Sequence, residues 1–497
     1  MVRSSGILMH ISSIPSPYGI GTMGEEAYNF VDFLHNSGQR YWQILPICPT
    51  SFGDSPYQSF STFAGNPYFI DLDKLCDEGL LKKSDYENLD WGNDPTYVDY
   101  AKLYELRFTV LKKAYNTWKE NNQEMLSRFR QTNAEWIEEY AIFMSIKNEN
   151  GGKAWYEWAP ELRLRDPEAL QTYRKNHSED ISFWVFTQYM FYRQWNELKL
   201  YASEKNVSII GDLPIYVARD SADVWANPEI FWLDQDLNPV RVAGCPPDGF
   251  SATGQLWGNP LYRWDVMKED KYSWWVRRMK AASEVYDIIR IDHFRGFDSY
   301  FAIPYGDETA EFGEWMEGPG IEFFISLEQQ LGKLDIIAED LGFLTQSVHD
   351  LLQNSGFPGM KVLEFAFDSR ESSDYLPHTY EKHCVVYTGT HDNETVTGWM
   401  HTAPREDIEY AKRYLRLRKS EGYNWGLIKA VWASVGDLAI AQMQDFLDLG
   451  SESRMNIPST VGENWRWRAE KEAFNEELET QIYDITKLYG RLVKGRV

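Results

Sequence analysis

Short apolar segments recur along the whole chain, and each is followed by a turn or a polar loop. Eight of them have the length and composition of β-strands, and longer stretches of helical period separate them. They cover residues 6–10, 41–46, 207–212, 287–292, 334–339, 360–365, 384–388 and 437–442. Parallel strands are buried on both faces and need crossover connections, so this alternation predicts an α/β protein with a (β/α)8 TIM barrel.

A doubly wound open sheet is the alternative that fits the same alternation. The first predicted strand is not followed by the glycine-rich turn of dinucleotide-binding sheets, which favours the barrel. We therefore expect residues 1–497 to form a single catalytic barrel.

Two insertions interrupt the regular spacing of strands and helices. Residues 75–180 are rich in Glu, Lys, Tyr and Trp with helical period, which predicts a helical subdomain. Residues 219–265 are rich in Pro, Gly, Asp and Trp, which predicts a loop-rich subdomain. Loops after barrel strands carry the binding residues of this fold, so we expect the second insertion to lie over the active site.

Composition and charge narrow the classes of partner. Hydrophobic residues make up 43% and charged residues 25%, as in an ordinary globular protein. Aromatic residues reach 15%, with 20 Trp, which indicates that some of them line a binding surface. The formal net charge of -25 disfavours nucleic acid and anionic membranes as partners but leaves neutral ligands unaffected.

Cysteine use and the N-terminal sequence bear on location. The four cysteines, Cys48, Cys76, Cys245 and Cys384, form no C-x-x-C pair, and four free thiols in a reducing compartment is the simplest interpretation. The apolar run at residues 6–9 is too short for a signal peptide, and no stretch of about 20 apolar residues exists. These features predict a cytoplasmic protein.

Four polar clusters fall directly after predicted strands, at residues 211–217, 290–296, 338–342 and 389–395. Asp and Glu often end strands by capping the next helix, but four clusters on matching strand ends exceed what capping explains. Since all strand ends of a barrel meet at one rim, the clusters should converge in space. That rim would collect Asp212, Arg290, Asp292, His293, Glu339, His391 and Asp392.

These residue types suit the cleavage of a glycosidic bond, which needs one ionised carboxylate and one protonated carboxylic acid. Arg290 lies two residues before Asp292 on the same strand face and should keep Asp292 ionised. Glu339 follows an apolar run and is the better general acid. His391 and Asp392 could hold sugar hydroxyls while positive charge develops at the anomeric carbon.

A divalent metal is the competing use of such a cluster. No H-x-x-x-H or H-E-x-x-H spacing is present, and Arg290 would repel a cation beside Asp292. We expect neither a metal nor another cofactor.

Together the clusters resemble the characteristic regions of the α-amylase clan, and in detail those of the 4-α-glucanotransferases called amylomaltases. The similarity extends from residues 10–15 and 55–67 to residues 454–460 and 464–468, so it covers nearly the whole chain. It implies a barrel with inserted subdomains and no separate C-terminal β-domain. It also implies transfer of α-1,4-glucan segments between maltooligosaccharides by a retaining double displacement.

The resemblance also implies a role for each matching residue. Asp292 would be the nucleophile, Glu339 the general acid and then base, and Asp392 the transition-state stabiliser. Substrate-binding roles would fall to Tyr57, Asp212, Trp257, Arg290, His391, Asn456 and Pro458. Of these, Tyr57 would stack beneath the sugar at the cleaved bond, and Trp257, Asn456 and Pro458 would contact neighbouring glucose units.

Two positions depart from the family pattern. Asp212 is followed by Leu-Pro where amylases of the clan carry an Asn-His pair, which favours the transferase branch. Ser459 stands where Gly is expected in many relatives, so the resemblance does not determine the shape of the loop after Asn456. The aromatic loop around Phe250 and Trp257 could exclude water or bind an acceptor.

Three other functions remain as alternatives to the transferase: a hydrolase of the same clan, a glucan-binding protein without catalysis, and a metal-dependent hydrolase. The presence of all three carboxylates argues against loss of catalysis. The expected partners are maltooligosaccharides and α-1,4-glucans, and we expect a monomer or a weak homo-oligomer.

Overall fold

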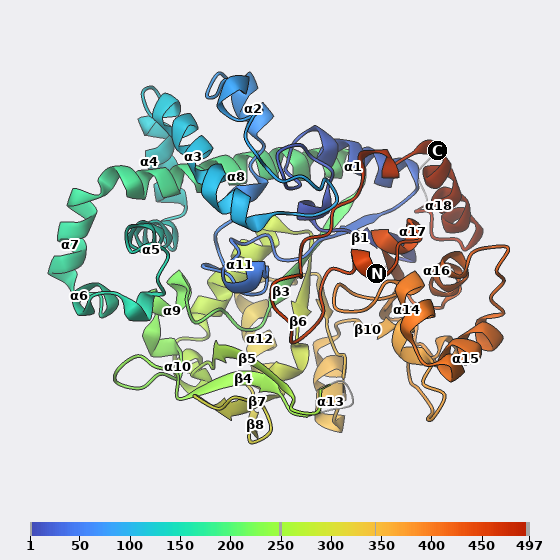
Figure 1. Ribbon diagram of the computed structural model, residues 1–497. Coiled ribbons are helices and arrows are strands. Elements are labelled where there is room, and N and C mark those ends of the chain that lie inside the picture. The colour runs from blue at the N-terminus through green and yellow to red at the C-terminus, as the bar shows by residue number, and fades with distance from the viewer. Residues whose placement is uncertain (1, 248–250, 343, 494–497) are drawn as a thin grey trace.

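The computed structural model describes residues 2–247, 251–342 and 344–493 (Figure 1). Within these residues, eight strands form one parallel sheet in the spatial order β10-β11-β12-β1-β2-β3-β6-β9. Each of them overlaps one of the eight predicted strands. Their bounds are β1 Ser4–Leu8, β2 Tyr41–Gln43, β3 Ser208–Pro214, β6 Ile288–Asp292, β9 Ile336–Ala338, β10 Gly359–Val362, β11 Cys384–Tyr387 and β12 Leu438–Gln442.

The sheet curls into a nearly closed barrel. Its two end strands meet where the Ala338 amide of β9 donates a hydrogen bond of 3.0 Å to the carbonyl oxygen of Pro358, just before β10. The prediction of a (β/α)8 barrel is therefore confirmed, and the open doubly wound sheet was the wrong alternative. Along the seam between the first and last strands, β1 pairs with β12 over its full length.

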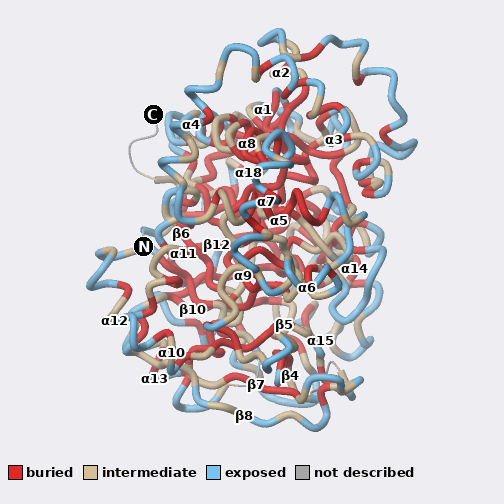
Figure 2. Tube along the Cα trace, turned by 90° about the vertical axis from the view of Figure 1, so that its left-hand side faces the viewer, coloured by how far each residue is buried: buried red, intermediate tan, exposed pale blue. Residues whose placement is uncertain are grey.

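The barrel strands are buried on both faces, as their continuous apolar sequences require. All five residues of β1, all five of β12 and all four of β11 are buried. Helix α1 (Glu25–Asn36) turns one face inward, with Ala27, Phe30, Val31 and Leu34 buried at spacings of three and four. Buried residues gather inside the molecule and exposed ones on its outer loops (Figure 2).

Further helices connect the barrel strands and end the chain. They are α8 Ser178–Glu204, α11 Ser273–Val285, α12 Gly320–Leu331, α13 Gln346–Ser355, α14 Val396–Thr402, α15 Arg405–Leu415, α16 Tyr423–Ala433, α17 Met443–Phe446 and α18 Glu476–Leu488. Beyond α18, the fully buried Arg491 donates hydrogen bonds to the carbonyl oxygens of Ser4 and Trp432, both at 2.8 Å. In the described part of the chain, no helix combines the length and apolar character needed to cross a bilayer.

The segment 75–180 is helical and extends to one side of the barrel, at the left of Figure 1. Its central helix is α5, which has nine buried residues and packs on α8. The short helix α2 (Leu72–Asp77) precedes the group. The other helices are α3 Tyr100–Trp118, α4 Gln123–Thr132, α5 Ile137–Glu149, α6 Pro160–Arg163 and α7 Pro167–Asn176.

The segment 219–265 contains two strands as well as loops. β4 (Arg241–Cys245) and β5 (Gln255–Pro260) join β7 (Ser299–Pro304) and β8 (Glu314–Glu317) in an antiparallel sheet of order β5-β4-β7-β8. Two short helices, α9 (Ala222–Ala226) and α10 (Trp264–Glu269), flank these strands. This second sheet has a small core of its own, made by Val242, Phe301, Ile303 and Ala310.

Candidate active site

The polar clusters predicted from the sequence meet at the carboxyl ends of the barrel strands. Asp212 lies within β3, Asp292 is the last residue of β6, and Glu339 follows β9 directly. The register pairs Asp212 with Arg290 and Ile291 with Ala338, so the next residues, Asp292 and Glu339, end neighbouring strands. The rim therefore brings together carboxylates that are far apart in sequence.

A buried ion-pair network lies beneath this rim. Arg290 Nη1 donates to Asp212 Oδ2 at 2.6 Å and to Asp292 Oδ1 at 3.0 Å, and Tyr57 Oη donates to Asp212 Oδ2 at 2.7 Å. The side chain of Asp212 is 0% exposed and that of Arg290 is 3% exposed. Both therefore lie beneath the surface of the site, where Arg290 bonds to Asp292 and Asp212 bonds to Tyr57.

Neighbouring carboxylates keep Arg290 positively charged although it is buried. Burial alone lowers the pKa of Arg290, but the carboxylates of Asp212 and Asp292 raise it well above its usual value. Burial raises the pKa of Asp292, and the guanidinium of Arg290 opposes that rise while the carboxylates of Asp212 and Glu339 add to it. Arg290 contacts both Asp212 and Asp292 directly, and of these two carboxylates only Asp292 has a partly exposed side chain, at 27%.

Glu339 is held by the backbone. Its Oε2 accepts a hydrogen bond of 2.7 Å from the His293 amide, and its Oε1 accepts one of 2.8 Å from the Leu341 amide. His293 adopts a left-handed φ of 55°, which turns the chain sharply after Asp292. Burial raises the pKa of Glu339, and the Arg290 charge and the two amide bonds oppose the rise.

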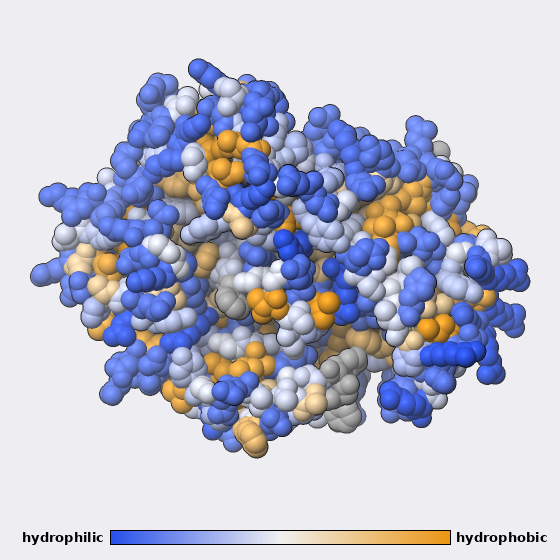
Figure 3. Space-filling view, viewed as in Figure 1, coloured by the Kyte–Doolittle hydropathy of each residue, from blue (hydrophilic) through white to orange (hydrophobic). Residues whose placement is uncertain are grey.

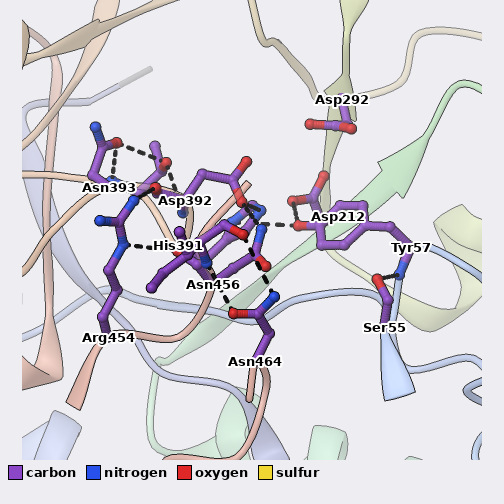
Figure 4. A network of polar contacts seen from close by, with 12 residues as sticks. Ser55, Tyr57, Asp212, Asp292, His391, Asp392, Asn393, Arg454, Asn456 and Asn464 are labelled. Atoms are coloured by element: carbon purple, nitrogen blue, oxygen red, sulfur yellow. Dashed lines mark hydrogen bonds and ion pairs between the residues drawn. The ribbon is translucent and has the colours of Figure 1, made fainter. Parts of the chain in front are cut away.

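Across the site, His391, Asp392 and Asn456 form a second polar group (Figure 4). Asn456 Nδ2 donates to Asp392 Oδ1 at 2.6 Å, and His391 Nε2 lies 3.4 Å from the same oxygen. The His391 ring stacks on the Tyr57 ring at a centroid distance of 4.9 Å. Burial lowers the pKa of His391, so the imidazole is neutral near neutral pH.

Arg454 is a residue that the sequence reasoning did not single out. Its Nη2 donates to the carbonyl oxygen of Asp392 at 2.6 Å, and its Nε donates to the carbonyl oxygen of Asn456 at 2.8 Å (Figure 4). It thereby ties the loop of Asp392 to the late loop of the chain. The signal was present, because Arg454 opens the Arg-Met-Asn motif that ends in Asn456.

Two further residues with expected binding roles lie at the margin of the site. Trp257, in β5, is half-buried and meets the His293 ring nearly perpendicularly at 4.8 Å. Pro458 is exposed and lies two residues beyond Asn456. The next residue, Ser459, adopts a left-handed φ of 65°, the conformation that favours glycine, so the loop takes that turn with serine. Phe250 lies outside the described residues.

The geometry defines a class of protein: a (β/α)8 barrel enzyme whose rim carries three carboxylates, one of them held by a buried arginine. Such a rim is suited to carbohydrate chemistry. Over the described ranges, no three His, Cys, Asp or Glu side chains are grouped so that they could hold a metal ion.

Comparison with known proteins identifies the particular family. The family model described as 4-alpha-glucanotransferase matches residues 9–473. The 4-alpha-glucanotransferase of Clostridium butyricum is 49% identical over 97% of this chain and 100% of its own, and that of Streptococcus pneumoniae is 48% identical over 100% and 99%. The chain therefore belongs to the 4-alpha-glucanotransferase family, and the family predicted from the motifs is confirmed.

A solved structure agrees with this assignment. The amylomaltase from Streptococcus agalactiae, determined in complex with acarbose, superposes with a TM-score of 0.96 at 47% identity, covering 98% of this chain and 99% of its own. The amylomaltase from Corynebacterium glutamicum, at 18% identity and a TM-score of 0.75, shares the fold.

Proposed function

We propose that this protein transfers α-1,4-glucan segments between maltooligosaccharides by a retaining double displacement. Asp292 is the nucleophile, Glu339 the general acid and then base, and Asp392 the stabiliser of the transition state. The observation that carries the proposal is the pair of carboxylates on adjacent strand ends, one bonded to Arg290 and the other held by backbone amides.

The placement of Asp292 and Glu339 supports retention of configuration. Their strands are neighbours in the barrel, and neighbouring strands lie about 4.8 Å apart. Retaining enzymes separate their two carboxyl groups by about 5 Å, whereas inverting enzymes need more than about 6.5 Å to admit a water molecule. Adjacent strand ends thus match the closer spacing.

The division of roles follows from the charges. Burial raises the pKa of both carboxyl groups, and the charge of Glu339 adds to the rise for Asp292, so the pair retains a proton more readily than isolated acids would. The Arg290 contact favours the negative charge on Asp292, which leaves the proton to Glu339.

In the first step, Asp292 forms a bond to the anomeric carbon while the bond to the bridging oxygen breaks and Glu339 gives that oxygen its proton. In the second step, an acceptor hydroxyl attacks the same carbon, gives its proton to Glu339 and releases Asp292. Two inversions restore the α configuration. The neutral His391 and the carboxylate of Asp392, held by Asn456, would grip the sugar as charge develops.

Transfer requires that a sugar hydroxyl outcompete water at the intermediate. The contact between Trp257 and His293 supports the proposal that segment 219–265 overhangs the site and assists this exclusion. The helical segment 75–180 is proposed to be an insertion in the single catalytic barrel.

Incubation with maltotriose tests the activity. Transfer should yield glucose together with oligosaccharides longer than maltotriose, whereas products limited to glucose and maltose would identify a hydrolase. Asp292→Asn should abolish turnover while maltooligosaccharide binding persists. Full activity in that variant would refute the nucleophile assignment. NMR of the newly formed linkages should detect only the α configuration.

A further inference from the structure

Trp315 is a large aromatic side chain on the edge strand β8 that remains 45% exposed. Its indole ring packs on the guanidinium of Arg295, whose Cζ lies 4.0 Å from the ring centroid. The Phe301 ring meets it at 5.2 Å with the planes 62° apart, an edge contact. These contacts cover one face and one edge of the indole, so the exposed area is its opposite face.

Trp315 is supported by the small core of the second sheet. Trp315 is paired in register with Phe301 across β7 and β8, and Phe301 belongs to the small core of the second sheet. Phe312, which is 77% exposed, lies on the loop before β8. Its neighbour Gly313 fits closely against Phe301, since a Cβ atom there would lie 2.3 Å from the ring. In Figure 3, apolar residues reach the surface over β7 and β8, at the lower edge of the view.

Trp315 is connected to the Glu339 side of the site. Arg295 follows Asp292 by three residues, in the turn where the Phe294 amide donates to the carbonyl oxygen of Glu339 at 3.0 Å. Trp257 lies on the same side, against His293, whose amide binds the Glu339 carboxylate. Trp257 and Trp315, on the two edge strands of the second sheet, therefore both contact the segment that follows Asp292, Trp257 through His293 and Trp315 through Arg295.

We propose that the open face of Trp315 is an acceptor-side platform on which a glucose unit of an α-glucan stacks, farther from the cleaved bond than the unit beside Trp257. Phe312 extends this platform. The assignment rests on the proposed function, in which Glu339 protonates the oxygen of the departing chain, so that departing and incoming glucans occupy its side of the site. A neutral sugar is not repelled by the surrounding carboxylates, and its C–H face matches a flat aromatic ring.

Varying the length of the acceptor separates binding at Trp315 from binding next to the cleaved bond. With amylose as donor, glucose should fill the position next to the cleaved bond without reaching Trp315, whereas maltotriose should reach it. In Trp315→Leu, we expect the KM for maltotriose as acceptor to rise about fivefold to tenfold, the effect of losing one aromatic stacking contact. The KM for glucose should stay within about twofold of the wild-type value.

Three variants complete the comparison. Trp315→Phe retains a ring and should recover most of the affinity for maltotriose. Phe312→Ala should show a smaller rise in the same KM. Leu488→Ala removes a side chain that is 72% exposed on α18, away from the second sheet, and should leave both acceptors unaffected.

Equal KM changes for glucose and maltotriose, or none for either, would overturn the platform. So would a Trp315-dependent dimer in sedimentation experiments with unchanged acceptor KM, since the surface would then be a contact between two copies of the chain. If the wild-type protein only hydrolyses, the proposed function fails, and calorimetry with maltoheptaose on the Asp292→Asn background decides. Binding about fivefold weaker after Trp315→Leu supports the platform, and an unchanged Kd refutes it.

Discussion

The substitution Asp212→Asn tests two roles of the buried ion-pair network, its contribution to stability and its effect on the pKa of Asp292. It keeps the shape of the side chain but removes the charge that faces Arg290 at 2.6 Å. Removing one partner of a buried ion pair usually costs about 3–5 kcal/mol, because the other charge is left buried. Arg290 retains its contact with Asp292, so we expect a loss near the lower limit, about 3 kcal/mol.

The same substitution should extend activity to lower pH. The negative charge of Asp212 raises the pKa of Asp292, and Asp212 also competes for the guanidinium of Arg290. Its removal lowers the pKa of Asp292, so the nucleophile stays ionised in more acidic solution. The acid limb of kcat/KM for maltotriose should therefore move to lower pH.

Urea unfolding and pH profiles measure the two effects. Asp32→Asn is the matched control, because Asp32 pairs with Lys205 at the same 2.6 Å but is 40% exposed, and such surface pairs contribute at most about 1 kcal/mol. Equal destabilisation by the two substitutions, or an acid limb that moves to higher pH in Asp212→Asn, would refute this account of the network.

Three further outcomes are expected. Glu339→Gln should lower kcat by about 10²- to 10⁴-fold, and the fall in wild-type activity at high pH, which follows loss of the Glu339 proton at its raised pKa, should disappear in pH profiles. Asn456→Ala removes the 2.6 Å donor to Asp392 and should lower kcat about tenfold to a hundredfold in maltotriose assays without loss of stability. Phe30→Ala leaves a cavity beneath α1 and should cost about 3–5 kcal/mol in urea unfolding, with unchanged kcat in the folded enzyme.

The barrel was predictable because its signal is local. A strand buried on both faces needs an unbroken apolar run, and each of the eight runs became a strand. The strand ends were less predictable. β1 begins at Ser4 rather than Gly6 because Ser4 pairs with Leu438, a partner more than 400 residues away in sequence.

The second sheet was not predicted, for two physical reasons. β4 contains Gly244, which weakens the strand pattern, yet a Cβ atom there would clash with the backbone of β5. β8 has mostly exposed residues and owes its conformation to pairing with β7. Neither property is visible in a local window of sequence.

The residues of the site were predictable from the sequence, but their burial and contacts were not. Strand-end position marked Asp292 and Glu339, and alternation along the strand marked Arg290. The complete burial of Asp212 and its 2.6 Å contact with Arg290 depend on the register between β3 and β6, which the sequence does not display. One of the two amides that hold Glu339 likewise lies in a left-handed turn, at His293, and the other belongs to Leu341, two residues beyond Glu339.

Because β1 pairs with β12, the barrel cannot close until nearly the whole chain has been synthesised. Until residues 438–442 have been synthesised, β1 has only β2 beside it, and its other edge presents unpaired backbone N–H and C=O groups. β1 is therefore synthesised long before its partner β12, and the barrel closes late, through contacts of very long sequence separation.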